Sequence, residues 1–318
     1  MPDPPALWIR YHRDFDGMVS AAVLSRILSD RGERRVLLQS VNYDQRRDWS
    51  TFCSGQRFAV VDFHFHPRAE YWFDHHPTTF LDETYREAYV PSERWAWDPE
   101  SPSCPPMILA HAKQHWDYDA PEHFQEMAHW SDIVDAALFE SVDQALFGEE
   151  PALRITRALT SGPNPNWTDG LAEAMTESSL ESVANRADVE KAYELSAKNR
   201  DKALRQFPDC ILEVKDDVLL YDASSNKVRR ERFAPFYHHP EIHYAVGVIP
   251  TRAGFHVTAG ENPWNKPSHR IHVGEIMEAY GGGGHIAVGG ANPEYLEATR
   301  IVAAEITETL RKGMAEHR

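Results

Sequence analysis

The segment LWIRYHRDFDG, residues 7–17, joins an apolar run to a group of ionisable side chains. The apolar run over residues 7–11 predicts a buried strand, and the pattern over residues 18–30 predicts the helix that follows it. Further strands are expected over residues 36–41, 58–61 and 71–73, and helical patterns cover residues 107–116 and 121–147. Strands that alternate with helices indicate an open parallel α/β sheet, which binds ligands at the carboxyl ends of its strands.

The second half of the chain has a different pattern. Residues 168–207 are helical and charged, and Pro208 ends them, which predicts a helical connector over residues 168–208. Beyond it we expect a hairpin, a second strand pair, a short helix, a glycine-rich loop and a terminal helix, over residues 211–221, 243–258, 273–280, 281–290 and 293–313. The predicted organisation is a parallel-sheet domain over residues 1–167 and a smaller, mixed-sheet α/β domain over residues 209–318.

Composition limits the functions that this chain can perform. Its 318 residues carry 33 Lys and Arg against 49 Asp and Glu, a net charge of −16. Proteins that hold long nucleic acid need a basic face, so long duplex DNA is not expected as a partner. No apolar run reaches the roughly 18 residues of a membrane span, and residues 1–10 lack the core of a signal peptide. We therefore predict a cytoplasmic protein without membrane contact, and the sequence leaves a homodimer open.

Ionisable residues follow several of the predicted strands. His12, Asp14 and Asp16 alternate after the first strand, so on an extended chain they share one face and could bind a hard cation. A single aspartate capping the next helix is the alternative, but it accounts for only one of the three. Asp62 ends the strand over residues 58–61, where a loop or cap role is the alternative. The nearby His64 and His66 are read as surface or supporting histidines.

Two further motifs add ligand-type side chains. Asp74, His75 and His76 end the strand over residues 71–73, and of two adjacent histidines one can bind metal while the other meets substrate. A polar turn closed by Pro77 is the alternative. The aspartates at positions 132 and 135 lie three residues apart on a predicted helix and share a face, either as ligands or as solvated surface.

Together these groups predict a metal centre. Oxygen and imidazole ligands without sulfur suit Mn²⁺, or alternatively Mg²⁺, better than structural zinc. This many carboxylates predicts two ions, which can clamp both oxygens of an in-line phosphoryl displacement. The run Gly281-Gly282-Gly283-Gly284-His285 lets backbone amides approach a phosphate closely, and a flexible linker is the alternative.

The order and spacing of these motifs resemble motifs I to IV of the DHH phosphoesterase superfamily. The matching positions are residues 12–17, Asp62, residues 74–76 and Asp132, and residues 281–285 resemble the GGGGH signature of the DHH-associated C-terminal domain. The superfamily includes RecJ exonucleases, oligoribonucleases that also dephosphorylate 3′-phosphoadenosine 5′-phosphate, cyclic-dinucleotide phosphodiesterases and relatives of the manganese pyrophosphatases. The resemblance covers most of the chain.

The resemblance implies a role for each residue. His12 and Asp14 would bind one Mn²⁺, Asp16 and His75 the other, and Asp62 would bridge them. Asp132 would complete the second ion, with Asp135 as the alternative. Asp74 would orient the neighbouring histidines. His76 would touch the phosphate, and His285, with the loop glycines, would contact substrate from the second domain. The implied activity is hydrolysis of short oligonucleotides or nucleotide-like phosphoesters.

The match departs from the family at one point. Oligoribonuclease-type members carry a Ser-x-Arg-Ser stretch before the GGGGH loop, whereas residues 257–264 contain no arginine here. Asn262, Arg252 or Arg270 could replace it. The departure favours, as the second candidate, a phosphatase of small nucleotides such as 3′-phosphoadenosine 5′-phosphate. A non-catalytic nucleotide-binding relative is the third candidate.

Overall fold

The computed structural model describes residues 5–162, 164–225, 230–251 and 254–316. These residues form two units, which are described separately. Unit 1 comprises the described residues of Met1–Leu138 and Glu149–Ser196, and unit 2 those of Phe139–Gly148 and Ala197–Arg318. The expected connector, residues 168–208, is thus shared between the two units. None of the described helices is both long enough and apolar enough to cross a membrane.

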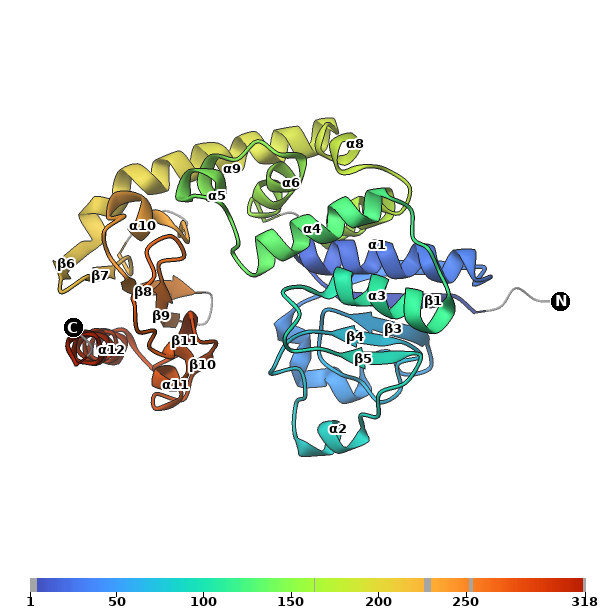
Figure 1. Cartoon of the computed structure of the whole chain (residues 1–318), viewed down its shortest axis with the longest axis horizontal. Helices are drawn as coiled ribbons and strands as arrows, with labels where there is room; N and C mark the ends of the chain where they lie inside the picture. The colour runs from blue at the N-terminus through green and yellow to red at the C-terminus, as the bar shows by residue number, and fades with distance from the viewer. Residues whose placement is uncertain (1–4, 163, 226–229, 252–253, 317–318) are drawn as a thin grey trace. The chain divides into compact units, whose positions relative to one another are not determined.

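Unit 1 is built on a five-stranded parallel sheet, coloured blue to teal in Figure 1. Its strands are β1 (Leu7–His12), β2 (Val36–Val41), β3 (Arg57–Val61), β4 (Trp72–Asp74) and β5 (Trp95–Trp97), in the spatial order β2-β1-β3-β4-β5. Every neighbouring pair is parallel, so the predicted open parallel sheet is confirmed. Strand β5 was not expected, because only three residues of an aromatic, turn-rich segment pair with β4.

Helix α1 (Phe15–Asp30) lies at the centre of unit 1. Most of its side chains are buried, because the helix packs against the sheet and also against α3 (Cys104–Trp116), α4 (His123–Asp135) and α7 (Pro165–Met175). A helix that is apolar on most of its circumference belongs in such a position. The other helical segments of unit 1 are η1 (Tyr43–Thr51), α2 (Glu83–Ala88), α6 (Pro151–Leu159), α8 (Leu180–Ala184) and the first part of α9 (Ala187–Gln206).

The helical pattern over residues 121–147 forms two helices rather than one. Helix α4 ends at Asp135, and α5 (Val142–Phe147) belongs to unit 2. Ala137 has a φ of 54°, which a continuing helix cannot accommodate, and the Ser141 side chain caps the start of α5. The periodicity of apolar residues correctly predicted a helix on each side of this break but did not reveal the break itself.

Aromatic side chains form a second core in unit 1, separate from the one around α1. Its buried members include Trp49, Phe63, Phe65 and Trp72. The indole nitrogens of Trp49 and Trp72 donate hydrogen bonds of 2.9 Å to the carbonyls of Phe65 and Phe63. These bonds fix the irregular segment after β3 and hold η1 against it.

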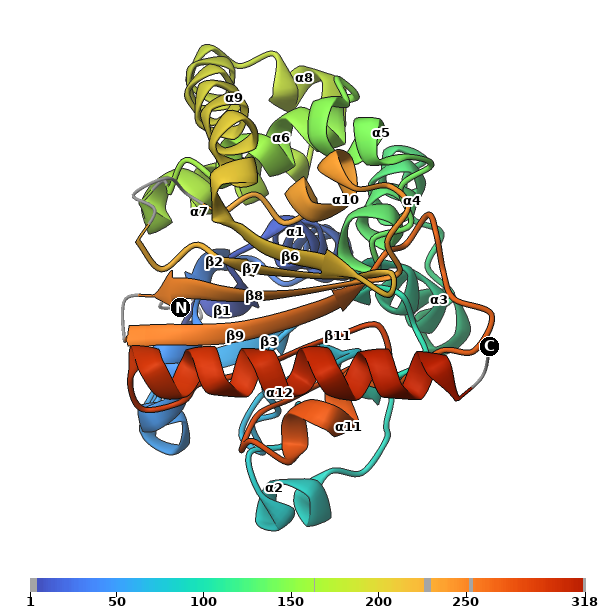
Figure 2. The same ribbon diagram turned by 90° about the vertical axis from the view of Figure 1, so that its left-hand side faces the viewer.

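Unit 2 contains a mixed sheet, as predicted, but it has six strands, because the expected loop over residues 281–290 contributes two further strands. Its order is β10-β11-β9-β8-β7-β6, and β7 and β8 are parallel while the other pairs are antiparallel. The strands are β6 (Ile211–Lys215), β7 (Val218–Asp222), β8 (Tyr244–Thr251), β9 (Gly254–Glu261), β10 (Gly283–Gly284) and β11 (Val288–Ala291). Helices α11 (Val273–Glu278) and α12 (Leu296–Ala315) pack on this sheet, and Figure 2 shows α12 running along the strands. The unit also contains η2 (Phe207–Cys210) and α10 (Ala234–His238).

The glycine-rich segment is packed rather than flexible. A Cβ atom on Gly282 would lie 2.2 Å from the Gly290 carbonyl oxygen, and one on Gly284 would lie 2.2 Å from that of Val288. Gly284 also has a φ of 156°, and the His285 amide donates a 2.7 Å hydrogen bond to Val288. Backbone therefore approaches backbone here, which only glycine permits, and the flexible-linker interpretation is wrong.

Candidate metal centre

The ligand-type residues of unit 1 gather where parallel strands end. His12 closes β1, Asp62 follows β3, and Asp74 closes β4. Because the strands are parallel, these three ends meet at one edge of the sheet.

The turn from β1 into α1 depends on two residues. Asp14 caps α1 by accepting a 2.9 Å hydrogen bond from the Gly17 amide. A Cβ on Gly17 would lie 2.0 Å from the His12 carbonyl oxygen, so glycine alone allows the helix to begin this close to the strand. The tight turn brings His12, Asp14 and Asp16 to the same edge.

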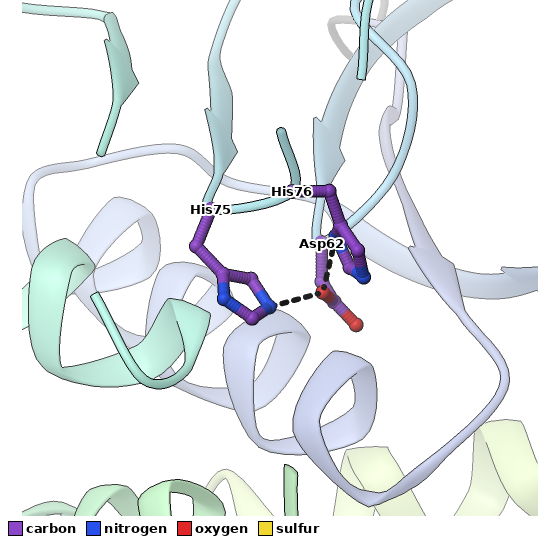
Figure 3. A group of neighbouring side chains, drawn as sticks. All are labelled: Asp62, His75 and His76. Atoms are coloured by element: carbon purple, nitrogen blue, oxygen red, sulfur yellow. Dashed lines mark ion pairs between the residues drawn. The ribbon is translucent and has the colours of Figure 1, made fainter. Parts of the chain in front are cut away.

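Three overlapping groups of ligand atoms form at this edge, each lying within 4.8 Å: Asp62, His75 and His76; His12, Asp14 and Asp62; and Asp16, His75 and Asp135. The His75 Nε2 atom is 3.5 Å from a carboxylate oxygen of each of Asp16, Asp62 and Asp135. On the other side, His12 Nδ1 lies 2.7 Å from Asp14 Oδ2 and 3.8 Å from Asp62 Oδ2. Figure 3 shows His75 and His76 reaching Asp62 from consecutive positions.

Hydrogen bonds orient both histidines of the pair. His75 Nδ1 lies 3.1 Å from the Ser101 carbonyl, which can only accept, so the proton resides on Nδ1 and the Nε2 lone pair is left for a ligand. His76 Nδ1 lies 2.9 Å from Asp74 Oδ1, and the Trp97 indole donates to the His76 carbonyl. Asp74 is fully buried, so it is well placed for the orienting role that was expected of it.

Several buried carboxylate oxygens at this edge accept no hydrogen bond from the described residues. Neither Asp62 side-chain oxygen has a hydrogen-bond partner among the described residues, and the same holds for Asp16 Oδ1. Burial, followed by the charges of neighbouring carboxylates, raises the pKa of Asp62 and of Asp16 well above the usual value. Buried charges of one sign require a counter-charge. Carboxylate and imidazole donors without a thiolate fit hard or borderline divalent cations.

Neighbouring carboxylates also affect the histidines. Burial disfavours the charged imidazolium, but Asp14 outweighs it and raises the pKa of His12. The pKa values of His75 and His76 are raised in the same way, with Asp16 and Asp74 as the leading carboxylates. The charge of His12 in turn holds the pKa of Asp14 well below its usual range, although burial acts against this.

We predict that the metal-free protein loses stability as the pH rises. The raised pKa values of Asp16 and Asp62 give stability that is complete below about pH 4, their value in the unfolded chain, and is lost as pH passes through the folded values. The raised pKa values of the three histidines also give stability that is lost as the pH rises, from about pH 6.5 upward. The lowered pKa of Asp14 has the opposite effect, but it changes stability only below about pH 4.

Thermal unfolding in a chelator should show the melting temperature falling between about pH 5 and 8. With Mn²⁺ the slope should reverse, because cations bind the deprotonated ligands. A melting temperature of the metal-free protein that rises with pH over this interval would contradict the raised pKa values of these groups.

The structure brings Asp135, not the preferred Asp132, to the ligand group. Asp135 lies on the last turn of α4 and faces His75. Asp132 instead accepts a 2.7 Å hydrogen bond from the Ser103 hydroxyl at the start of α3. The two aspartates thus lie within one helix turn but have different contacts. Asp135 faces the candidate ligand group, and Asp132 contacts the start of α3.

His64 and His66 are buried rather than exposed. Their exposed fractions are 6% and 1%, and burial lowers the pKa of each to about 4. His64 Nδ1 lies 3.1 Å from the Thr79 carbonyl, and His66 Nδ1 accepts from the Arg68 amide. Both are neutral members of the aromatic core, and the surface interpretation is wrong.

The expected substrate residues of unit 2 differ in their burial and in their contacts. Asn262 is buried, donates to the Pro240 and Ile242 carbonyls and accepts from the Trp264 amide, so its amide is fully used within the fold. Arg270 forms a 2.8 Å ion pair with Glu261. His285 is exposed on the glycine-rich turn, and Gly283 has open space where a side chain would lie. Arg252 lies outside the described residues.

One further side chain, Tyr43, lies at the candidate metal centre and was not predicted from the sequence. Tyr43 follows β2 at the same edge of the sheet, and its ring centroid lies 4.9 Å from that of His12. Its position just after the strand over residues 36–41 was the available signal, but tyrosine is not one of the residue types that predict a metal site.

Comparison with known proteins identifies the fold. No family model matches the sequence, and no curated protein matches it. Among solved structures, the pGpG-specific phosphodiesterase PggH from Vibrio cholerae superimposes with a TM-score of 0.68 at 21% identity, over 96% of this chain and 98% of that one. RecJ from Thermus thermophilus in complex with Mn²⁺ gives 0.57 at 12% identity, over 96% of this chain and 52% of that one.

The same comparison places the chain within a fold class. The DHH domain of a member of the s1p family of ribosomal proteins gives a TM-score of 0.56 at 13% identity, over 96% of this chain and 86% of that one. The chain therefore has the fold of the DHH-domain proteins, which is the fold that the resemblance of its motifs implied. Within this class it is similar in fold, over nearly the full length of both chains, to a phosphodiesterase.

Proposed function

We propose that this protein is a divalent-metal-dependent phosphoesterase that hydrolyses short oligonucleotides. The observation that carries the proposal is the convergence of Asp16, Asp62 and Asp135 around His75 at the strand ends, with buried oxygens of Asp16 and Asp62 left for cations. A protein selected only for stability would not retain such a cluster, because like charges at this separation raise the free energy of the folded state.

The groups of ligand atoms support two cation positions. His12 and Asp14 would hold one ion, while Asp16, His75 and Asp135 would hold the other, and Asp62 lies within reach of both sets. Mn²⁺ is the proposed ion, and Mg²⁺ is the alternative. Two divalent cations would supply Lewis acidity, which activates water for attack and offsets the charge of a phosphoryl group.

His76 is the proposed contact to the phosphoryl group. Its Nδ1 atom is engaged by Asp74, so Nε2 is the nitrogen left for substrate. The nearby Asp74 raises the pKa of His76 despite burial, which favours the protonated ring. A protonated imidazole donates a charge-assisted hydrogen bond to an oxyanion. Asp74 would therefore fix both the orientation and the charge of His76.

A short substrate agrees with the charge of the chain. A net charge of −16 repels long polyanions, whereas one or two phosphates can be captured by cations at a local site. Similarity in fold to a pGpG-specific phosphodiesterase makes a linear dinucleotide the first substrate to test. We propose that unit 2 binds substrate through His285 and the turn formed by Gly282, Gly283 and Gly284. Asn262 is not included, because its amide is used within the fold.

The second candidate is a phosphatase of small nucleotides. It is favoured by residues 257–264, which lack the arginine that oligoribonuclease-type relatives carry before the glycine run. Such an enzyme would act on 3′-phosphoadenosine 5′-phosphate in preference to a dinucleotide.

Residence in the cytoplasm remains a prediction.

A hydrolysis panel tests the proposal. Purified protein with Mn²⁺, Mg²⁺ or chelator would be assayed on pGpG, longer RNA and DNA, 3′-phosphoadenosine 5′-phosphate, cyclic dinucleotides and pyrophosphate. We expect Mn²⁺-dependent cleavage of the linear dinucleotide to mononucleotides, with rates that fall as the oligonucleotide lengthens. Faster turnover of 3′-phosphoadenosine 5′-phosphate would favour the phosphatase. Absence of metal-dependent turnover on every substrate would contradict both candidates.

A further inference from the structure

Tyr43 follows β2, one of the two strands of this sheet whose ends carry no proposed metal ligand. The ends of β1, β3 and β4 supply the ligand-type residues, and β2 is the remaining strand next to β1. In the sheet register His12 pairs with Val41, and the Arg13 amide donates a 3.1 Å hydrogen bond to the Val41 carbonyl. Tyr43 follows two residues later, so its backbone is fixed beside His12.

The local fold holds Tyr43 in this position. It is the first residue of η1, and the turn is closed by a 3.0 Å bond from the Gln45 amide to the Asn42 carbonyl and a 2.5 Å bond from the Asn42 amide to the Gln45 side chain. Its ring packs against Phe63 as well as His12, with centroid separations of 5.4 and 4.9 Å. These contacts orient a side chain that is nevertheless 52% exposed.

An exposed tyrosine beside an acidic centre requires an explanation. Packing accounts for only part of the side chain, because about half of it stays exposed although its ring contacts His12 and Phe63. A phenol ordinarily loses its proton only at about pH 10, so a tyrosine hydroxyl carries no negative charge at neutral pH that would repel a phosphate. It can donate a hydrogen bond to an oxyanion at the metal centre.

We infer that the Tyr43 hydroxyl donates a hydrogen bond to a phosphoryl oxygen of the substrate at this centre. The inference rests on the proposed phosphoesterase function and adds a neutral donor from the end of β2, whereas the histidine pair comes from the end of β4. Such a donor would contribute to substrate binding without competing for the cations.

The test compares Tyr43→Phe with wild type, and Tyr295→Phe serves as the control. The phenylalanine keeps the ring contacts to His12 and Phe63 and removes only the hydroxyl. Tyr295 lies in unit 2 with a similar exposed fraction of 61%. We expect Tyr43→Phe to lower kcat/KM on the linear dinucleotide by roughly 10-fold to 100-fold, the range for a hydrogen bond to a charged group. Mn²⁺ affinity, measured by calorimetry, should not change, and the control should match wild type.

A binding measurement separates this inference from the proposed function. Inorganic phosphate would be titrated into the Mn²⁺-loaded wild type and Tyr43→Phe. We expect the variant to bind about 10-fold more weakly. Equal phosphate affinity together with equal kcat/KM would overturn the inference while leaving the phosphoesterase in place. If the wild type hydrolyses nothing, the phosphate titration still decides, and a wild type that also binds no phosphate would overturn both.

A ring-stacking role is the competing explanation. Tyr43→Leu would remove the ring as well as the hydroxyl. If Tyr43→Leu lost activity and Tyr43→Phe retained it, the inferred hydrogen bond from the hydroxyl would be excluded. The contacts of the ring would then account for the role of Tyr43.

Discussion

Replacing Asp62 with asparagine is expected to abolish hydrolysis and, at the same time, to stabilise the metal-free protein. Asp62 lies within reach of both proposed cation positions, so its loss should lower kcat by at least about a thousand-fold, or roughly 4 kcal/mol. In the metal-free fold the same carboxylate is buried and repelled by Asp14, Asp74 and Asp135. Removing its charge relieves that repulsion and should raise the melting temperature by a few degrees, at roughly 2–4 °C per kcal/mol.

Asparagine is the informative replacement because of the backbone at this position. Asp62 has a φ of 53°, a conformation that asparagine tolerates as well as aspartate does and that alanine does not. Asp216→Asn is a matched control, because Asp216 has a φ of 50° on an exposed hairpin of unit 2. Activity and metal-free melting curves would be measured for both variants. Retention of more than a tenth of wild-type kcat, or a lower melting temperature for Asp62→Asn, would contradict the shared role of this carboxylate.

The parallel sheet and the gathering of ionisable side chains at one of its edges could be predicted because both follow from one simple rule. His12, Asp62 and Asp74 each come directly after a short apolar run, and the carboxyl ends of parallel strands meet at one edge. The positions of these three residues in the sequence therefore indicated that they lie close together, without any knowledge of long-range packing. The glycine run was recognisable as a special segment, but its packing against the backbone of Val288 and Gly290 was not predicted, and its approach to a phosphate stays a prediction.

Other features depended on contacts that have no local signature. Nothing in the segment around Trp95 distinguishes a three-residue strand from a loop until β4 is present to pair with it. His64 resembles an exposed polar residue in the sequence, yet η1 and the aromatic core cover it. In the sequence, Asn262 is a plausible substitute for a phosphate-binding arginine. In the structure its side-chain amide forms hydrogen bonds with three backbone groups instead. In each case a distant segment determines the role of the residue.

The choice between Asp132 and Asp135 is the clearest example. Both carboxylates lie on α4, three residues apart and so about 60° from each other around the helix axis. Helical periodicity cannot say which of them faces the sheet edge, because that depends on how α4 packs against α1 and α3. The Ser103 hydroxyl fixes Asp132 against the start of α3, and this contact leaves Asp135 facing His75.

Asp135→Asn is accordingly expected to impair catalysis much more than Asp132→Asn. Loss of one charged ligand should weaken the binding of the second cation and lower kcat by roughly 10-fold to 100-fold. The amide oxygen of Asp132→Asn can still accept the hydrogen bond from Ser103, so this variant should lose little activity and at most about 1 kcal/mol of stability. Mn²⁺ titration followed by calorimetry should show one tight site in Asp135→Asn and two in Asp132→Asn. The opposite order of effects would mean that α4 presents the other aspartate to the metals, and the second cation position would then have to be rebuilt around Asp132.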